Sequence, residues 1–215
     1  MTIDNQDDLN EFKNSQPTRR RSPTGDADIV TIKMGDFYVT EHNEIISTIL
    51  GSCISACIRD RESGIGGMNH FMLPTFSLQE NNNWEYTAVN AAMRYGSYAM
   101  EHLINTILQK GGKRNNLEFK LFGGGDILGS FTTIGMHNVR FIRSYMKAEG
   151  YSIAAEYLGA THPIKLNYFP RTGIAKIKRL DERAVEIAAD EKTFMHHLEE
   201  QKVEGEVELF DSKDE

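Results

Sequence analysis

Residues 45–73 read IISTILGSCISACIRDRESGIGGMNHFML, a series of short apolar segments separated by small and charged residues. The β-branched segment 45–50 predicts a strand. In residues 53–59 the side chains alternate with the period of two that is typical of a half-buried strand. Residues 65–73 predict the return strand, because a charged turn with a glycine precedes them and a proline follows them. The stretch therefore predicts a first strand and then an antiparallel hairpin.

The rest of the chain predicts more short strands and two long helices. Helices are expected over residues 86–110 and 138–149, where apolar side chains recur every three or four residues. Further β-branched and aromatic runs lie at residues 29–32, 37–40, 117–122, 152–158, 165–169 and 173–178. Because strands outnumber helices and do not alternate with them regularly, we predict an α+β fold. Its expected form is a layered, mainly antiparallel or mixed β-sheet sandwich with two main covering helices.

The charge of the chain divides it into three segments. The formal net charge is −7 over 215 residues, but residues 181–215 alone hold 13 acids and 4 bases, so the rest of the chain is nearly neutral. Residues 1–27 are polar and mixed in charge, which predicts a flexible N-terminal tail. We therefore expect one functional domain over residues 28–180, followed by an acidic C-terminal helix and tail over residues 181–215. This domain is expected to fold and to act without the acidic segment.

Composition also excludes several classes of protein. The negative charge argues against a nucleic-acid binder, which normally has a basic surface. The longest uncharged run, residues 45–58, is too short and too polar to insert into a membrane, and no signal peptide is recognisable. Two cysteines are too few for a disulfide framework, so we expect a cytoplasmic protein with reduced thiols. The histidines are scattered, and the GGGD segment at 123–126 lacks the lysine of a phosphate-binding loop, so no metal and no cofactor are expected.

Cys53 and His70 are the first candidates for chemistry. A cysteine thiolate is a strong nucleophile, and a histidine can deprotonate it and later protonate a leaving group. If the hairpin is centred near residue 62, Cys53 lies opposite His70 or Phe71. Spacing alone leaves open a structural cysteine beside a histidine that is hydrogen-bonded in the core. Cys57 lies in the middle of the same strand, which favours a small core residue.

The residues before Cys53 supply candidates for two further roles. Gly51 and Ser52 form a turn of small residues, whose backbone N–H groups are free to form an oxyanion hole. Ser47 and Thr48 carry hydroxyls, and either is a candidate to hydrogen-bond His70 and fix its tautomer, the third role of a catalytic triad. The alternative for both hydroxyls is a hydrogen bond within their own sheet.

Several segments of the chain, in this order, resemble one known family. They are LGSCISACIRD (50–60), GGMNHFMLP (66–74), MRYGSYAMEHLIN (93–105), LFGGGDILG (121–129), GMHNVRFIRSYM (135–146) and LGATHPIKLNYFPRTG (158–173). This pattern is similar to the chemoreceptor glutamine deamidases, the CheD family. The resemblance implies a fold shared with bacterial toxins that deamidate glutamine, with Cys53 as nucleophile and His70 as catalytic histidine. The third residue of the family is a threonine six positions before the cysteine, which matches Ser47 here, and Thr48 is the alternative.

The resemblance also implies a function. It implies hydrolysis of specific glutamine side chains to glutamate on the cytoplasmic helices of chemotaxis receptors, through a Cys53 thioester and without a cofactor. We expect His70 to lower the pKa of Cys53 below the ~8.5 of a free thiol. The family resemblance further implies a chemotaxis phosphatase as a second partner. Two alternatives stay open at this point: an adaptor for that phosphatase with little catalysis, and a Cys–His peptidase or small-molecule amidase.

Overall fold

Two five-stranded sheets form the body of the protein in the computed structural model, which describes residues 17–23, 25–73, 84–127 and 134–200. The first sheet has the order β1 (Thr18–Arg21), β2 (Asp28–Thr31), β4 (Glu44–Leu50), β9 (Ile164–Phe169), β10 (Ile174–Arg179). The second has the order β3 (Phe37–Thr40), β6 (Gly66–Asn69), β5 (Ile54–Asp60), β7 (Leu117–Gly123), β8 (Ile153–Leu158). The pairs β2–β4 and β7–β8 are parallel, and the other described pairs are antiparallel.

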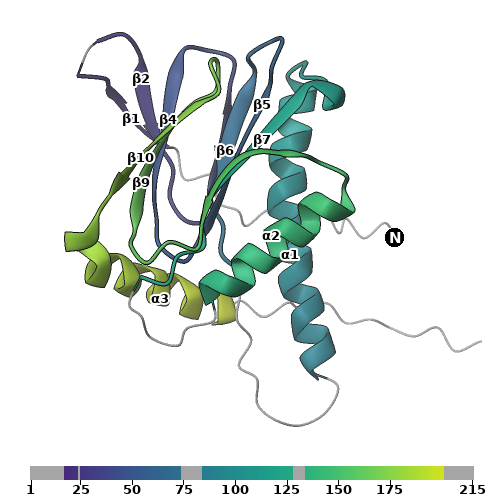
Figure 1. The fold of residues 1–215 in the computed structure, drawn as a ribbon, viewed down its shortest axis with the longest axis vertical. Coiled ribbons are helices and arrows are strands. Elements are labelled where there is room, and N and C mark those ends of the chain that lie inside the picture. The colour runs from purple at the N-terminus through teal and green to yellow at the C-terminus, as the bar shows by residue number, and fades with distance from the viewer. Residues whose placement is uncertain (1–16, 24, 74–83, 128–133, 201–215) are drawn as a thin grey trace, which may run out of the picture.

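In the described ranges three α-helices accompany the sheets (Figure 1): α1 (Trp84–Gln109), α2 (Ile134–Ala148) and α3 (Ala184–Glu200). Short 3₁₀ turns at Arg114–Asn116 and Asp181–Arg183 precede β7 and α3. The helices α1 and α2 lie against the second sheet, whereas α3 crosses one end of the sandwich. The predicted α+β fold with layered, mixed sheets and two main covering helices is confirmed.

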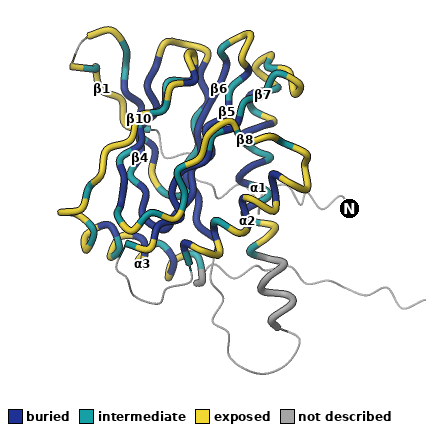
Figure 2. Tube along the Cα trace, in the orientation of Figure 1, coloured by how far each residue is buried: buried dark blue, intermediate teal, exposed yellow. Residues whose placement is uncertain are grey.

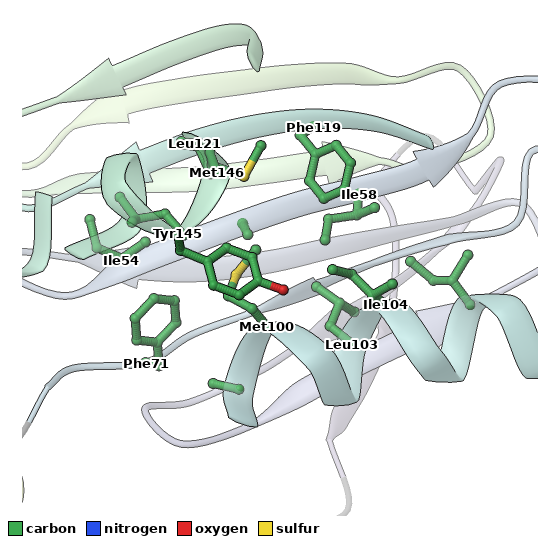
Figure 3. Close-up of a cluster of buried hydrophobic side chains, with 14 of the residues drawn as sticks. Ile54, Ile58, Phe71, Met100, Leu103, Ile104, Phe119, Leu121, Tyr145 and Met146 are labelled. Atoms are coloured by element: carbon green, nitrogen blue, oxygen red, sulfur yellow. The ribbon is translucent and has the colours of Figure 1, made fainter. Parts of the chain in front are cut away.

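The second sheet buries both of its faces in separate apolar cores. Ile54, Ala56 and Ile58 of β5 pack with residues of α1 and α2, as Figure 3 shows for Leu103 of α1 and its neighbours. Residues of the opposite parity, among them Cys57, pack against the first sheet between the two layers. The alternation in the sequence therefore marks a strand that is buried on both sides, and the buried colour of β5 in Figure 2 agrees with this.

The register of the β5–β6 hairpin differs from the predicted one. Cys57 lies opposite Met68, and an isolated bridge joins Ile54 to Phe71. The position opposite Cys53 is therefore Met72, rather than His70 or Phe71. The shift arises in the turn, where the Asp60 N–H donates to the Ile65 carbonyl and so closes the hairpin later than a turn centred near residue 62 would.

The strand β1 lies inside the range for which the sequence predicts a flexible tail. Arg19 on this strand donates to Glu44 at 2.7 Å and to the Tyr38 hydroxyl at 2.6 Å. The Glu44 side chain is only 6% exposed, and a buried carboxylate needs a positive partner and hydrogen bonds. The tail prediction therefore does not hold for residues 18–21, while residues 1–16 lie outside the described part of the chain.

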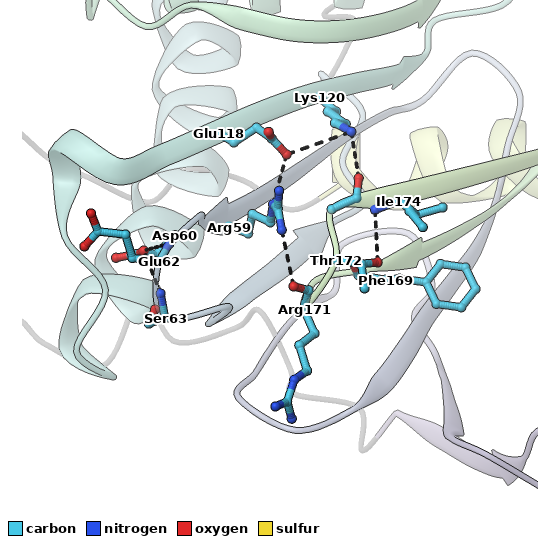
Figure 4. Close-up of polar contacts among 11 residues, drawn as sticks. Arg59, Asp60, Glu62, Ser63, Glu118, Lys120, Phe169, Arg171, Thr172 and Ile174 are labelled. Carbon is cyan, nitrogen blue, oxygen red and sulfur yellow. Dashed lines mark hydrogen bonds and ion pairs between the residues drawn. The ribbon is translucent and has the colours of Figure 1, made fainter.

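Asp60 holds the hairpin turn together (Figure 4). Its Oδ1 accepts backbone N–H groups of Glu62 at 2.7 Å and Ser63 at 3.1 Å. Its Oδ2 accepts the Lys113 N–H at 2.7 Å. Burial raises the pKa of Asp60, but these three N–H groups outweigh burial and hold the pKa below its ordinary value. Asp60 therefore stabilises the fold at neutral pH, and this contribution is lost as the pH falls through the lowered pKa.

We expect Asp60→Asn to lower the free energy of unfolding by about 2–3 kcal/mol, because the new amide places a donor against a backbone N–H group that the wild-type carboxylate accepts. Urea denaturation at pH 7 measures this loss, with Glu62→Gln as the matched control, since that side chain is exposed. The difference in the free energy of unfolding between the wild type and Asp60→Asn should become smaller in acid, because the wild-type carboxyl group becomes protonated there. Equal urea midpoints for Asp60→Asn and wild type at pH 7 would contradict this role.

Candidate active site

The turn formed by Gly51, Ser52 and Cys53 joins β4 of the first sheet to β5 of the second. Because it passes from one sheet to the other, it places Cys53 at one end of the layer between them. The Cys53 side chain is fully buried there and belongs to the same apolar cluster as Leu50 and Met72. We call residues 51–53 the nucleophile turn, after the role that the sequence predicts for Cys53.

All three carbonyl groups of the nucleophile turn are held by neighbouring segments. The Gly51 carbonyl accepts the Gly125 N–H, and the Cys53 carbonyl accepts the Gly124 N–H, both at 2.7 Å. The Ser52 carbonyl accepts Nδ2 of Asn138, on α2, at 2.8 Å. The glycine-rich segment 123–126 thus packs directly on the nucleophile turn.

Gly123 shows why this contact requires glycine. Its φ is +103°, a conformation that other residues rarely adopt, and a Cβ added there would lie 2.0 Å from the Cys53 carbonyl oxygen. The close approach of the two backbones fixes the orientation of the nucleophile turn.

With the carbonyls held on one side, the N–H groups of the nucleophile turn point together to the other. The N–H groups of Gly51 and Cys53 donate to Oε1 of Glu191 at 3.1 and 3.2 Å. The N–H and hydroxyl groups of Ser52 donate to Oε2 of the same carboxylate at 2.9 and 2.8 Å. Successive N–H groups that converge in this way form an anion-binding concavity, the geometry of an oxyanion hole.

His70 lies in the layer between the sheets and is hydrogen-bonded to Thr48. Nδ1 of His70 and Oγ1 of Thr48 are 2.8 Å apart, and the same Oγ1 donates to the Ile32 carbonyl at 2.9 Å. A hydroxyl has one hydrogen, so Thr48 must accept from Nδ1–H of the histidine. This fixes the tautomer in which Nε2 carries the lone pair. Nε2 is buried and has no hydrogen-bond partner among the described residues.

The hairpin register relates this histidine to the cysteine. Since Ile54 pairs with Phe71, Cys53 and His70 face the same layer from neighbouring strands as diagonal neighbours. The hairpin therefore places the two residues on neighbouring strands in a register different from the expected one, and no hydrogen bond joins Cys53 to His70 in the described part of the chain.

Ser47 is on the other face of β4. Residues 46, 48 and 50 face the layer between the sheets, so residue 47 must point away from it. Ser47 is paired with Thr31 and Asn167 of the flanking strands, and no hydrogen bond joins it to His70 in the described part of the chain. Of the two candidate orienters, the structure brings Thr48 to the histidine.

Burial keeps both groups of the Cys–His pair neutral in this structure. Burial lowers the pKa of His70 to about 3. For Cys53, burial and then the charge and hydrogen bond of Glu191 raise the pKa well above that of an ordinary thiol. The predicted lowering of the Cys53 pKa is therefore wrong for this arrangement, in which a carboxylate lies beside the thiol. Burial also raises the pKa of Cys57, which has no such neighbour.

Glu191 is the site residue that the sequence interpretation missed. It lies on α3, in the segment that was expected to be outside the functional domain, yet it contacts every residue of the nucleophile turn. Ile187, Glu191 and Met195 are 5%, 7% and 6% exposed, at a spacing of four residues. The usable signal was an acidic residue at the centre of an otherwise apolar helical stripe.

The described residues contain no group of three or more histidine, cysteine, aspartate or glutamate side chains that could hold a metal ion. Within the same ranges, no helix is long and apolar enough to cross a membrane. Cys53 and Cys57 are both free thiols.

Comparison with known proteins identifies the family of the chain. The family model described as "CheD chemotactic sensory transduction" matches residues 72–179. A protein of Halorhodospira halophila named "Probable chemoreceptor glutamine deamidase CheD" is 48% identical over 177 residues, 82% of either chain. Proteins of the same name from Hydrogenovibrio crunogenus and Thiobacillus denitrificans are 45% identical over 85% and 86% of this chain, and over 95% and 91% of their own. The chain belongs to the CheD family.

Proposed function

We propose that this chain is a chemoreceptor glutamine deamidase, a hydrolase that converts glutamine side chains of chemotaxis receptors to glutamate and releases ammonia. Its CheD relatives carry the name of this activity. The observation that carries the proposal is the convergence of three backbone N–H groups on one carboxylate beside Cys53. A glutamine side chain has the same length and shape as the glutamate side chain, so the same N–H groups can hydrogen-bond to the oxygen of its carboxamide.

The first half of the reaction forms a thioester. Nε2 of His70 takes the proton of the Cys53 thiol, and the sulfur attacks the carboxamide carbon of the glutamine. The charge that develops on the carboxamide oxygen is stabilised by the N–H groups of the nucleophile turn. His70 then gives its proton to the nitrogen, which leaves as ammonia because the amide anion is too basic to leave by itself.

The second half hydrolyses the thioester. His70 takes a proton from water as the water attacks, and the proton returns to the departing Cys53 sulfur. The net change is glutamine plus water to glutamate plus ammonia, and the sequence of steps uses only side chains and backbone groups of the chain. We assign Thr48 as the residue that orients His70, on the strength of its hydrogen bond to Nδ1. Ser47, the position that matches the family's threonine by count, has no comparable support.

The substrate that we propose is the cytoplasmic helical region of chemoreceptors. A cytoplasmic location follows from that substrate and agrees with the two free thiols. Each turnover adds one negative charge to a receptor helix and creates a carboxylate, which changes the repulsion between packed helices. A chemotaxis phosphatase remains a proposed second partner, suggested by the family resemblance alone.

Mass spectrometry of a receptor cytoplasmic fragment incubated with the full chain tests this function. We expect intact fragments in which individual glutamines have become glutamates, and ammonia released in equal amount. Fragments of lower mass would identify a peptidase instead. Ammonia from free glutamine but not from the receptor fragment would identify a small-molecule amidase. An unmodified fragment, with tight binding of a chemotaxis phosphatase, would identify an adaptor.

A further inference from the structure

We propose that α3 occupies the substrate site as an internal copy of the reaction product. The substrate is therefore a helix in which apolar residues lie four positions before and four positions after the reacting glutamine. The proposal rests on the function given above and names the shape of its substrate. It also assigns a role to the C-terminal segment, which lies beyond the residues matched by the family model.

The chemistry of the contact is the first support. A glutamate side chain is what remains when a glutamine has been deamidated. The Glu191 carboxylate accepts four hydrogen bonds from the nucleophile turn, and its negative charge contributes to raising the pKa of the neighbouring Cys53 thiol. Both of its oxygens therefore lie where the oxygens of a newly formed product would lie before release.

The helix that carries Glu191 is the second support. Met195, one turn after Glu191, belongs to the same apolar cluster as Cys53 and Met72, and Phe194 packs at its edge. Ile187, one turn before Glu191, is buried as well. The surface under α3 thus binds a helix through an apolar–acidic–apolar stripe, in which the acidic side chain makes the hydrogen bonds to the nucleophile turn.

Two consequences follow from this arrangement. A receptor helix can reach Cys53 only when α3 is displaced, since Cys53 is fully buried beneath it. A substrate helix that replaces α3 must cover the same apolar surface, so its glutamine needs apolar neighbours at the positions of Ile187 and Met195. Removal of the Glu191 carboxylate should weaken α3 as a competitor without removing a group that acts in catalysis.

Glu191→Gln provides the sharpest test, because it converts the internal product into an internal substrate. We expect the purified variant to carry glutamate at position 191, produced by its own Cys53. The change replaces NH₂ by OH, which the tryptic peptide 184–192 reports by mass and fragmentation. Glu186→Gln is the matched control in the same peptide, since Glu186 is exposed and lies away from the nucleophile turn. The glutamine introduced by Glu186→Gln should persist. The glutamine at position 191 should also persist in the double variant Glu191→Gln with Cys53→Ala.

Glu191→Ala gives the second readout. We expect it to deamidate a receptor fragment about tenfold faster than the wild type, in the range of typical coupling between sites, while Glu186→Gln stays at the wild-type rate. Conversion at position 191 without receptor turnover would support the inference and overturn the receptor as substrate. In preparations that do deamidate the receptor, two results would overturn the inference alone. One is that the glutamine of Glu191→Gln persists, and the other is that Glu191→Ala deamidates the receptor at the wild-type rate. Loss of both activities would overturn both proposals.

Discussion

Cys53→Ala is expected to abolish deamidation of a receptor fragment, whereas Cys57→Ala should keep most of the wild-type rate. Cys53 is at the turn where three N–H groups converge, so its removal takes away the atom that forms the covalent bond. Cys57 is opposite Met68 in the interior of β5, and its loss leaves only a small cavity. We expect this cavity to lower the free energy of unfolding by about 1 kcal/mol. Ammonia release and urea denaturation measure the two effects.

The two variants control each other, because each removes one buried thiol from the same strand region. Circular dichroism shows whether both proteins are folded before the rates are compared. Equal rates in Cys53→Ala and Cys57→Ala would remove Cys53 from the role of nucleophile. A large loss in Cys57→Ala, in a folded protein, would reassign that role.

Thr48→Ala should lower kcat on the order of 10²-fold, the size of effect associated with loss of a well-placed acid–base group. Without the Thr48 hydroxyl, Nδ1 of His70 loses its acceptor, and the tautomer with a free Nε2 lone pair is no longer favoured. Thr48→Ser keeps the hydroxyl and should retain most of kcat. Rates on a receptor fragment as a function of pH measure this change, since a positioning role also alters the pH profile.

Ser47→Ala is the neighbouring control for this prediction. Because Ser47 faces away from the layer that contains His70, its loss should leave both kcat and the pH profile close to those of the wild type. If Ser47→Ala proved more damaging to kcat than Thr48→Ala, the orienting role would return to the position that the family pattern suggests.

Most of the elements of the fold could be predicted from the sequence, because they depend on local patterns. The period of two in residues 53–59 and the apolar repeats of the two main helices identify elements within a few residues of their observed bounds. The hairpin register could not be predicted, since it depends on how Asp60 and Ile65 pair in the turn. The strand at residues 18–21 was missed because its partner Glu44 is distant in the sequence.

The candidate site, like the fold, could be predicted from the sequence only in part. Cys53 and His70 are predicted as site residues from residue type, spacing and the family resemblance. The choice between Ser47 and Thr48 depends on strand parity, which a shift of one position inverts. Glu191 lies about 140 positions from the nucleophile turn, so no local pattern connects the two. The one sequence feature that indicated Glu191 was the position of an acidic residue within an apolar helical stripe.

A thioester between a receptor glutamine and Cys53 is the most direct evidence that could be obtained for the proposed reaction. Cys53 and Cys57 share the tryptic peptide 34–59, so the measurement is best made with Cys57→Ala. The enzyme is mixed with excess receptor fragment, quenched in acid during the first turnovers, digested and analysed by mass spectrometry. We predict a receptor peptide joined to peptide 34–59 through Cys53, with loss of ammonia, and release of that peptide by hydroxylamine. The account would be contradicted if no such adduct formed and the Cys53→Ala variant also converted the receptor glutamines completely to glutamate.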